Sequence, residues 1–239
     1  MHEIERQNFF YRIGLDRDDE LGELCMAYDQ LARGLAEKEL MGKMLSQLAV
    51  SSVVALDSRQ NSRREKYAFL FVGCPGFSDW LGSGSVSDLF ADLQRQTAMV
   101  CQFIAQEGGD IDKFIGDKQL GIFMAKEPGK AVEAALKAAQ KIVDAEMKGQ
   151  LPFPVAIGAN YGEVINGYLG VGNKRDFTVI GDAVNISARI EKEAEKLRFQ
   201  RILFSEEFVA LSPEKSLFRP HGEVQLKGKS LPLALYVLQ

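Results

Sequence analysis

The chain of 239 residues is 46% hydrophobic, which supports one full core, or a core of roughly 200 residues with an appended helix, and excludes a disordered chain. Its net charge of −4 provides no overall basic field for nucleic acid or an anionic membrane. The two histidines are too few for a three-histidine zinc site. The three cysteines are widely separated and do not fit a disulfide framework, which favours a cytoplasmic location. Apolar runs are far shorter than the roughly 20 residues of a membrane helix, so a membrane link is expected only through a region before Met1.

Residues 18–35 have the pattern of a helix that pairs with another helix. Apolar side chains recur at alternating spacings of three and four residues, as in a coiled coil: Leu21, Leu24, Tyr28, Leu31 and Leu35. The pattern is interrupted near 36–42, and such an interruption can transmit a change of register. A helix packed on its own domain is the alternative. The interpretation places a signalling helix at 1–45, a connector at 46–66 and the main domain at 67–239.

Strands and helices alternate in the main domain. The patterns predict strands at 68–74, 111–115, 119–124, 155–160, 164–169, 177–180, 202–204, 224–226 and 234–238. Helices are predicted at 86–106, 128–147, 183–196 and 206–211. Six glycines between 158 and 181 imply a long hairpin interrupted by glycines. The fold class is α+β with a mixed sheet.

Two common phosphate-binding motifs do not fit this sequence. The segment Gly222–Ser230 has five residues between its glycines where a P-loop requires four, and it lies between predicted strands. No GxGxxG follows a strand and opens a helix, which argues against a dinucleotide-binding domain. A nucleotide would therefore be held by a different arrangement.

Four other segments are distinctive in order and spacing. They are Lys113–Asp117 (KFIGD), 158–170 (GANYGEVINGYLG), Arg175–Glu191 (RDFTVIGDAVNISARIE) and Leu226–Lys229 (LKGK). With these motifs, the chain from Tyr67 onward resembles the catalytic domain of class III nucleotidyl cyclases. Residues 13–40, with DDELGEL, resemble the second half of a HAMP signalling module. The resemblance implies a ferredoxin-like core of mixed sheet flanked by helices, and a head-to-tail homodimer, or a heterodimer with another cyclase domain.

The resemblance assigns recognition of the base to Lys113 and Thr178. N1 of adenine is an acceptor that needs a donor such as Lys113, whereas guanine carries N1–H and would need a carboxylate there. Lys113 therefore favours ATP over GTP.

The remaining substrate contacts also follow from the resemblance. Asn185 and Arg189 match the pair that orients the ribose and stabilises the transition state, and their i,i+4 spacing places both on one helical face. Lys227 matches a lysine that binds the triphosphate. Gly76 and Phe77 lie in the loop that offers main-chain N–H groups to the phosphates.

The metal site departs from the family pattern. In the family, the ribose 3′-hydroxyl attacks the α-phosphorus and releases pyrophosphate, with two Mg²⁺ or Mn²⁺ ions on two aspartates. Asp117 matches the second aspartate, whereas Gly73 stands where the first belongs. One carboxylate and the phosphates can still hold one ion. Restoring the carboxylate by Gly73→Asp is expected to raise cyclase activity.

The expected function is an adenylate-cyclase-type output domain of a HAMP-linked signalling protein, which binds ATP with a metal ion. Its conversion of ATP to cyclic AMP depends on whether one aspartate suffices. The alternative is a catalytically impaired pseudocyclase that acts as a nucleotide-binding dimerisation or regulatory module. Gly73 is the residue that separates the two hypotheses.

Overall fold

The computed structural model describes residues 13–14, 24–32, 63–80, 85–171, 174–225 and 232–239. Internal contacts divide the chain into two units, Met1–Ala55 and Leu56–Gln239. In the first unit, residues 24–32 form a helix, inside the range predicted for the coiled coil. The side chains of Leu24 and Leu31 are exposed on it. The other predicted coiled-coil positions, except Tyr28, lie outside the described residues.

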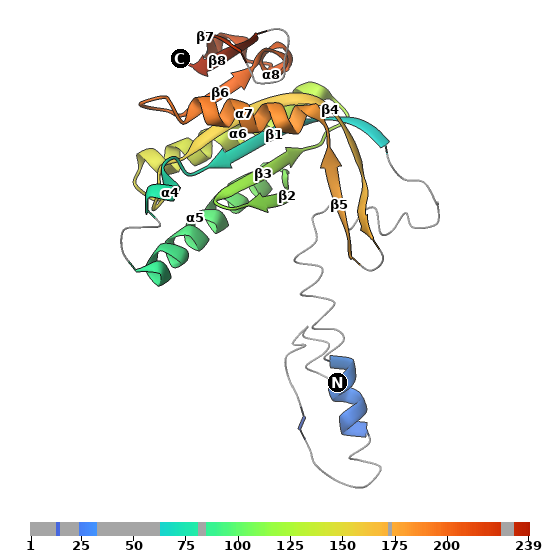
Figure 1. Ribbon diagram of the computed structural model, residues 1–239. Coiled ribbons are helices and arrows are strands. Elements are labelled where there is room, and N and C mark those ends of the chain that lie inside the picture. The colour runs from blue at the N-terminus through green and yellow to red at the C-terminus, as the bar shows by residue number, and fades with distance from the viewer. Residues whose placement is uncertain (1–12, 15–23, 33–62, 81–84, 172–173, 226–231) are drawn as a thin grey trace. The chain divides into compact units, whose positions relative to one another are not determined.

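The second unit is built on a mixed sheet, which confirms the predicted fold class. The strand order is β2-β3-β1-β4-β6-β8-β7, and β5 pairs with β4 (Figure 1). β4 and β6 are parallel, whereas the other neighbouring strands are antiparallel. The strands are β1 (Arg63–Gly73), β2 (Asp110–Ile115), β3 (Lys118–Phe123), β4 (Ala156–Val171), β5 (Lys174–Ile180), β6 (Ile202–Ser205), β7 (Phe218–Val224) and β8 (Leu233–Leu238).

Helices cover both faces of this sheet. They are α4 (Phe77–Trp80), α5 (Val86–Gln106), α6 (Pro128–Met147), α7 (Asp182–Ala194) and α8 (Glu206–Leu211), with a 3₁₀ turn η1 (Lys215–Leu217). α5 and α6 pack on one face, and α7 crosses β4 and β1 on the other (Figure 1). None of the described helices combines the length and apolarity that a bilayer crossing requires.

The two faces of β1 have different neighbours because side chains alternate along a strand. Ala68, Leu70 and Val72 are buried in the core formed with α5 and α6. The opposite face lies under α7 and ends at Gly73, where a side chain would meet Glu191 of α7. This alternation places Gly73 at the end of the central strand, on the side where the predicted catalytic helix lies.

β4 is one long strand, whereas the sequence pattern predicted two strands at 155–160 and 164–169. Its glycines do not make a turn; they let α7 approach the sheet closely. A Cβ on Gly158 would lie 2.1 Å from the Ser187 carbonyl oxygen, and one on Gly162 would lie 2.7 Å from the Ala183 Cβ. Glycine in a strand often marks such a close approach. The predicted hairpin is formed by β4 and β5. β5 covers Lys174–Ile180 and is longer than the predicted strand at 177–180.

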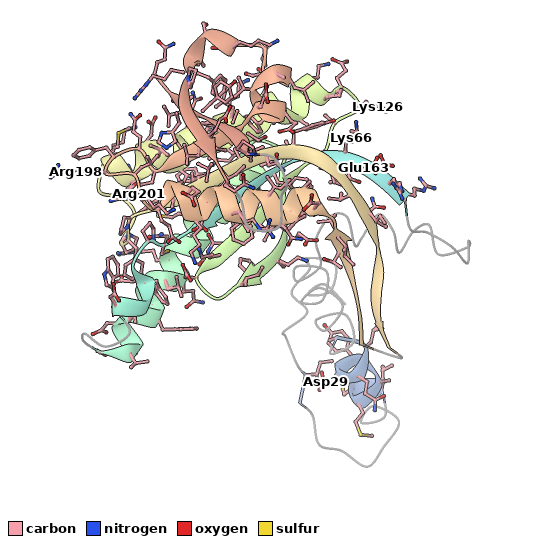
Figure 2. All side chains as sticks on the ribbon, turned by 45° about the horizontal axis from the view of Figure 1, so that its top comes forward. Asp29, Lys66, Lys126, Glu163, Arg198 and Arg201 are labelled. Atoms are coloured by element: carbon pink, nitrogen blue, oxygen red, sulfur yellow. The ribbon has the colours of Figure 1, made fainter. Side chains whose placement is uncertain are left out.

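Two strands begin earlier than the sequence pattern indicates. β1 begins at Arg63, inside the predicted connector, and its first four residues are exposed and charged. Lys66 lies opposite Glu163 of β4 (Figure 2). The Arg64 guanidinium lies 3.0 Å from the Glu163 carboxylate. β7 covers Phe218–Val224 rather than 224–226, and most of its side chains are exposed. Both segments are held by ladder hydrogen bonds to a neighbour, which a hydrophobic pattern does not reveal.

Candidate nucleotide site

A β-bulge in β2 brings two consecutive side chains to β5. The register against β3 shifts between Ile111 and Lys113, so Asp112 is the extra residue. The Lys113 Nζ lies 2.6 Å from Thr178 Oγ1 and 2.9 Å from Asp112 Oδ2. The Thr178 hydroxyl lies 3.2 Å from the same Asp112 oxygen. The structure thus brings together Lys113 and Thr178, the two residues that the sequence assigned to the base.

Asp112 is a member of this cluster that the sequence analysis missed. Its side chain is only 1% exposed. One carboxylate oxygen, Oδ1, is buried and has no hydrogen-bond partner among the described residues. The available signal was an acidic residue directly before the KFIGD motif, but strand alternation would have pointed it away from Lys113. The bulge removes that alternation.

Asp117 lies in the tight turn between β2 and β3, after Gly116, whose φ of 64° is in the left-handed region. The Asp117 carboxylate accepts the Cys74 main-chain N–H at 3.0 Å. This contact fixes the carboxylate beside the end of β1. Burial raises the pKa of the Cys74 thiol to about 12, and the negative charge of Asp117 adds to the effect.

The loop after β1 contains Gly76 and Phe77. Gly76 has a φ of 73°, and the Phe77 main-chain N–H donates to the Cys74 carbonyl at 3.2 Å. The ring of Phe77 packs edge-on against Phe153, with a centroid distance of 6.0 Å. Both the ring and the main-chain N–H of Phe77 are therefore used in contacts within this loop.

The space beside Gly73 is filled by an ion pair between β3 and α7. Lys118 Nζ lies 2.7 and 2.6 Å from the two carboxylate oxygens of Glu191, and 2.9 Å from Glu195 Oε1. A Cβ on Gly73 would lie 2.3 Å from Glu191 Oε1 and 3.2 Å from Lys118 Cγ. Gly73, which the sequence analysis places where the resemblance implies a first metal aspartate, is thus bordered by two long side chains that occupy the space beside it.

Burial and pairing act in opposite directions on the pKa values of Glu191 and Lys118. Burial raises the pKa of Glu191 to about 7, against the lowering effect of Lys118. Burial opposes the charged form of Lys118 as well, but hydrogen bonds and charges from Glu191 and Glu195 outweigh it and raise the Lys118 pKa. The sequence analysis missed both residues. Lys118 directly follows the Gly116–Asp117 turn, but the position that its side chain fills depends on Gly73.

The residues at this end of the sheet fit one metal ion and not two. Asp117 supplies one carboxylate, which is enough for Mg²⁺ or Mn²⁺ when substrate phosphates complete the shell. Where the second carboxylate would stand, beside Gly73, lies the Glu191 side chain, bound to the Lys118 ammonium. The described residues contain no group of three metal-binding side chains. The donor set therefore lacks the second half of the metal site that the family uses.

Asn185 and Arg189 lie on α7, one turn apart. Asn185 is exposed, and Arg189 is partly buried with no hydrogen bond or ion pair to the described residues. Both side chains thus remain available to a ligand. Lys227 lies outside the described residues.

Residues 60–239 match the profile of the adenylate and guanylate cyclase catalytic domain, and the chain belongs to that family. The match begins at residue 60, so the HAMP resemblance of residues 13–40 stays a prediction. An uncharacterized protein of Mycobacterium tuberculosis, Rv1318c, is 28% identical over 242 residues, which cover 98% of this chain. The chain spans 44% of that relative's length.

Solved cyclase structures share the fold. The adenylyl cyclase CyaB from P. aeruginosa aligns with a TM-score of 0.66 and 24% identity, over 75% of this chain and 96% of CyaB. A bacterial light-regulated adenylyl cyclase aligns with a TM-score of 0.80 and 20% identity, over 93% of this chain and 66% of that one. At these identities the similarity establishes the cyclase fold.

Proposed function

We propose that this domain binds ATP, as an adenylate-type member of its family. The observation that carries the proposal is the contact of Lys113 with Thr178 at 2.6 Å. An ammonium has three donors and no acceptor, so it pairs with an unprotonated ring nitrogen such as N1 of adenine. Guanine presents N1–H at that position, so two hydrogen-bond donors, N1–H and the Lys113 ammonium, would meet.

Asp117 is the residue that would hold a divalent ion, Mg²⁺ or Mn²⁺, together with the phosphates. Such an ion would neutralise phosphate charge. The main chain at Gly76 and the side chain of Lys227 would contact the phosphates. The guanidinium of Arg189 would meet charge that develops at the α-phosphate, and Asn185 would orient the ribose.

The nucleotide site is completed by a second cyclase domain, from another copy of this chain or a related one. Large apolar side chains are exposed on β2 and β5, which carry the base-reading pair, and on the neighbouring β4: Phe114 and Ile115 on β2, Ile180 on β5 and Ile165 on β4. Ile165 and Ile180 are opposite one another in the β4–β5 ladder and form one apolar surface. A monomer gains nothing from exposing these groups, whereas an interface would bury them.

A second candidate function is binding without turnover, as a pseudocyclase. The ion pair of Lys118 and Glu191 beside Gly73 favours it, because that space no longer accommodates the missing carboxylate. Attack by the 3′-hydroxyl depends on its activation, and the part of the chain that the structure describes offers no second carboxylate beside Gly73 that is free for a second ion, because that of Glu191 is paired with Lys118. The domain would then regulate a partner through nucleotide-dependent dimerisation.

The N-terminal unit would carry the signal, as the second half of a HAMP module on a coiled-coil helix. Leu24 and Leu31 are exposed on the helix of residues 24–32, as expected for a helix that lacks its partner. All three cysteines are free, which suits a cytoplasmic location.

Two measurements on the whole chain test this function. The first is binding of ATP and GTP, and the second is formation of cyclic nucleotide with Mg²⁺ and with Mn²⁺. Lys113→Glu should weaken ATP binding, whereas Lys137→Glu, on the exposed face of α6, should not. ATP binding with cyclic AMP formation supports a cyclase, and ATP binding alone supports the pseudocyclase. Failure to bind ATP, or equal binding by the Lys113→Glu variant, contradicts the proposal.

A further inference from the structure

We infer that Asp112 is a positioning residue that sets the ATP-over-GTP preference by fixing the direction of the Thr178 hydroxyl. The inference rests on the proposed binding of ATP and names how that same site selects its base. Asp112, Lys113 and Thr178 form a closed triangle with distances of 2.6, 2.9 and 3.2 Å. Two strands and one bulge are needed to build it.

The direction of each hydrogen bond follows from the chemistry of the three groups. The Lys113 ammonium only donates, so it donates to Thr178 and to Asp112. The Asp112 carboxylate beside this ammonium only accepts, so the Thr178 hydroxyl must give its single proton to Asp112. The remaining lone pair of Thr178 can then only accept a hydrogen bond.

This polarity matches one purine and opposes the other. The third N–H of Lys113 is a donor, and Thr178 is an acceptor, which complements the acceptor N1 and the amino group at C6 of adenine. Guanine presents a donor, N1–H, and an acceptor, the oxygen at C6, so both of its groups would face like groups. Without Asp112, the Thr178 hydroxyl could rotate and donate to the guanine oxygen, which would remove one of the two conflicts.

Asp112 acts through Thr178 and not by touching the base. Its side chain is 1% exposed and its free oxygen, Oδ1, is buried. An acceptor in this position is costly unless it serves the groups around it, because a buried, unpaired oxygen loses its water without replacement. The bulge that turns Asp112 inward shows that the fold places this carboxylate behind the base-reading pair.

The test measures ATP and GTP affinity of the whole chain with Mg²⁺ and non-hydrolysable analogues, so that turnover has no influence. Asp112→Leu should lower the ATP-to-GTP preference about tenfold, mainly through a gain in GTP binding. Asp112→Asn keeps an amide oxygen as acceptor and should retain most of the preference. Thr178→Val should lower the preference, and adding Asp112→Leu to it should have no further effect, because the hydroxyl is already absent.

Several outcomes would overturn the inference. Equal weakening of both nucleotides by Asp112→Leu would indicate a merely structural role. A further loss of preference in the double variant would show that Asp112 acts through Lys113. If Asp112→Leu does not fold, Thr178→Ser and Thr178→Val decide, since an equal preference in both would contradict the role of the hydroxyl. A wild-type chain that binds neither nucleotide rejects the proposed function as well, whereas binding with an unchanged preference rejects the inference alone.

Discussion

The Lys118 ammonium donates to both carboxylate oxygens of Glu191, at 2.7 and 2.6 Å, directly beside Gly73. The contact joins β3 to α7, the helix that carries Asn185 and Arg189. The position beside Gly73, where the resemblance implies a metal aspartate, is thus filled and carries a positive charge. The effect of this ion pair on the free energy of unfolding and its effect on metal binding can be measured separately.

Removal of Lys118 should destabilise the domain strongly. Lys118→Met leaves the buried Glu191 carboxylate without its counter-charge, and loss of one partner of a buried pair costs about 3 kcal/mol or more of unfolding free energy. The measurement is urea unfolding at pH 8, above the raised pKa of Glu191. Lys118→Met with Glu191→Leu should recover part of the loss. Lys137→Met breaks an exposed pair of the same 2.6 Å length and should leave stability unchanged; an equal effect of the two lysine variants would contradict the prediction.

The stability of the domain should fall as pH rises from about 4.5 to 7. Burial raises the pKa of Glu191 from 4.5 to about 7, so in this range the folded state binds more protons than the unfolded chain does. Burial also raises the pKa of Glu146, which acts in the same direction. Glu191→Gln cannot titrate and should flatten the curve by on the order of 2 kcal/mol. Unfolding at pH 5 and 7.5 measures the difference, and parallel curves for the two proteins would refute the assignment.

Gly73→Asp alone should not raise cyclase activity, in contrast to the expectation from the sequence. The new Cβ would lie 2.3 Å from Glu191 Oε1, which is held by Lys118, and a second carboxylate would be added beside the first. We expect a loss of about 1–3 kcal/mol in unfolding free energy and unchanged cyclase activity.

Combining Gly73→Asp with Lys118→Ala introduces a carboxylate at position 73 and removes the Lys118 ammonium that holds Glu191 in place. Titration with Mn²⁺ in the presence of an ATP analogue should give one ion per site in the wild type and two in this double variant. A gain of activity from Gly73→Asp by itself would show that the ion pair yields readily. Two ions per site in the wild type would contradict the conclusion that this site holds one metal ion.

Ile180→Glu should weaken the dimer without unfolding the domain. Ile180 is 52% exposed and faces Ile165 across the β4–β5 ladder, so a charge there would be desolvated in the proposed interface. Phe199→Glu, at a position that is 79% exposed between α7 and β6, is the matched control. Light scattering at micromolar concentration should show a shift towards monomer only for Ile180→Glu. An unchanged mass, with melting temperature intact, would place the interface elsewhere.

Local patterns predicted the elements that local forces define. α5 covers Val86–Gln106 as its apolar periodicity indicates, and Pro128 opens α6 as expected of a proline at the first turn. β1 beyond its charged start was visible as an apolar run, because buried strands select such residues. The α+β class and the cyclase family were both predicted and are confirmed, because the motifs that identify the family can be read in order along the sequence.

Only the tertiary structure decided which side chains share a position in space. The sequence shows that Gly73 lacks a carboxylate, but not that Lys118 and Glu191, 73 residues apart, use the space that it leaves. It pairs Lys113 with Thr178 by resemblance, but a bulge that no periodicity reveals turns Asp112 towards them. Periodicity records which face of an element is buried, because burial acts on each residue separately. Hydrogen bonds and ion pairs between distant segments depend on register and close approach, which exist only once the sheet and α7 are assembled.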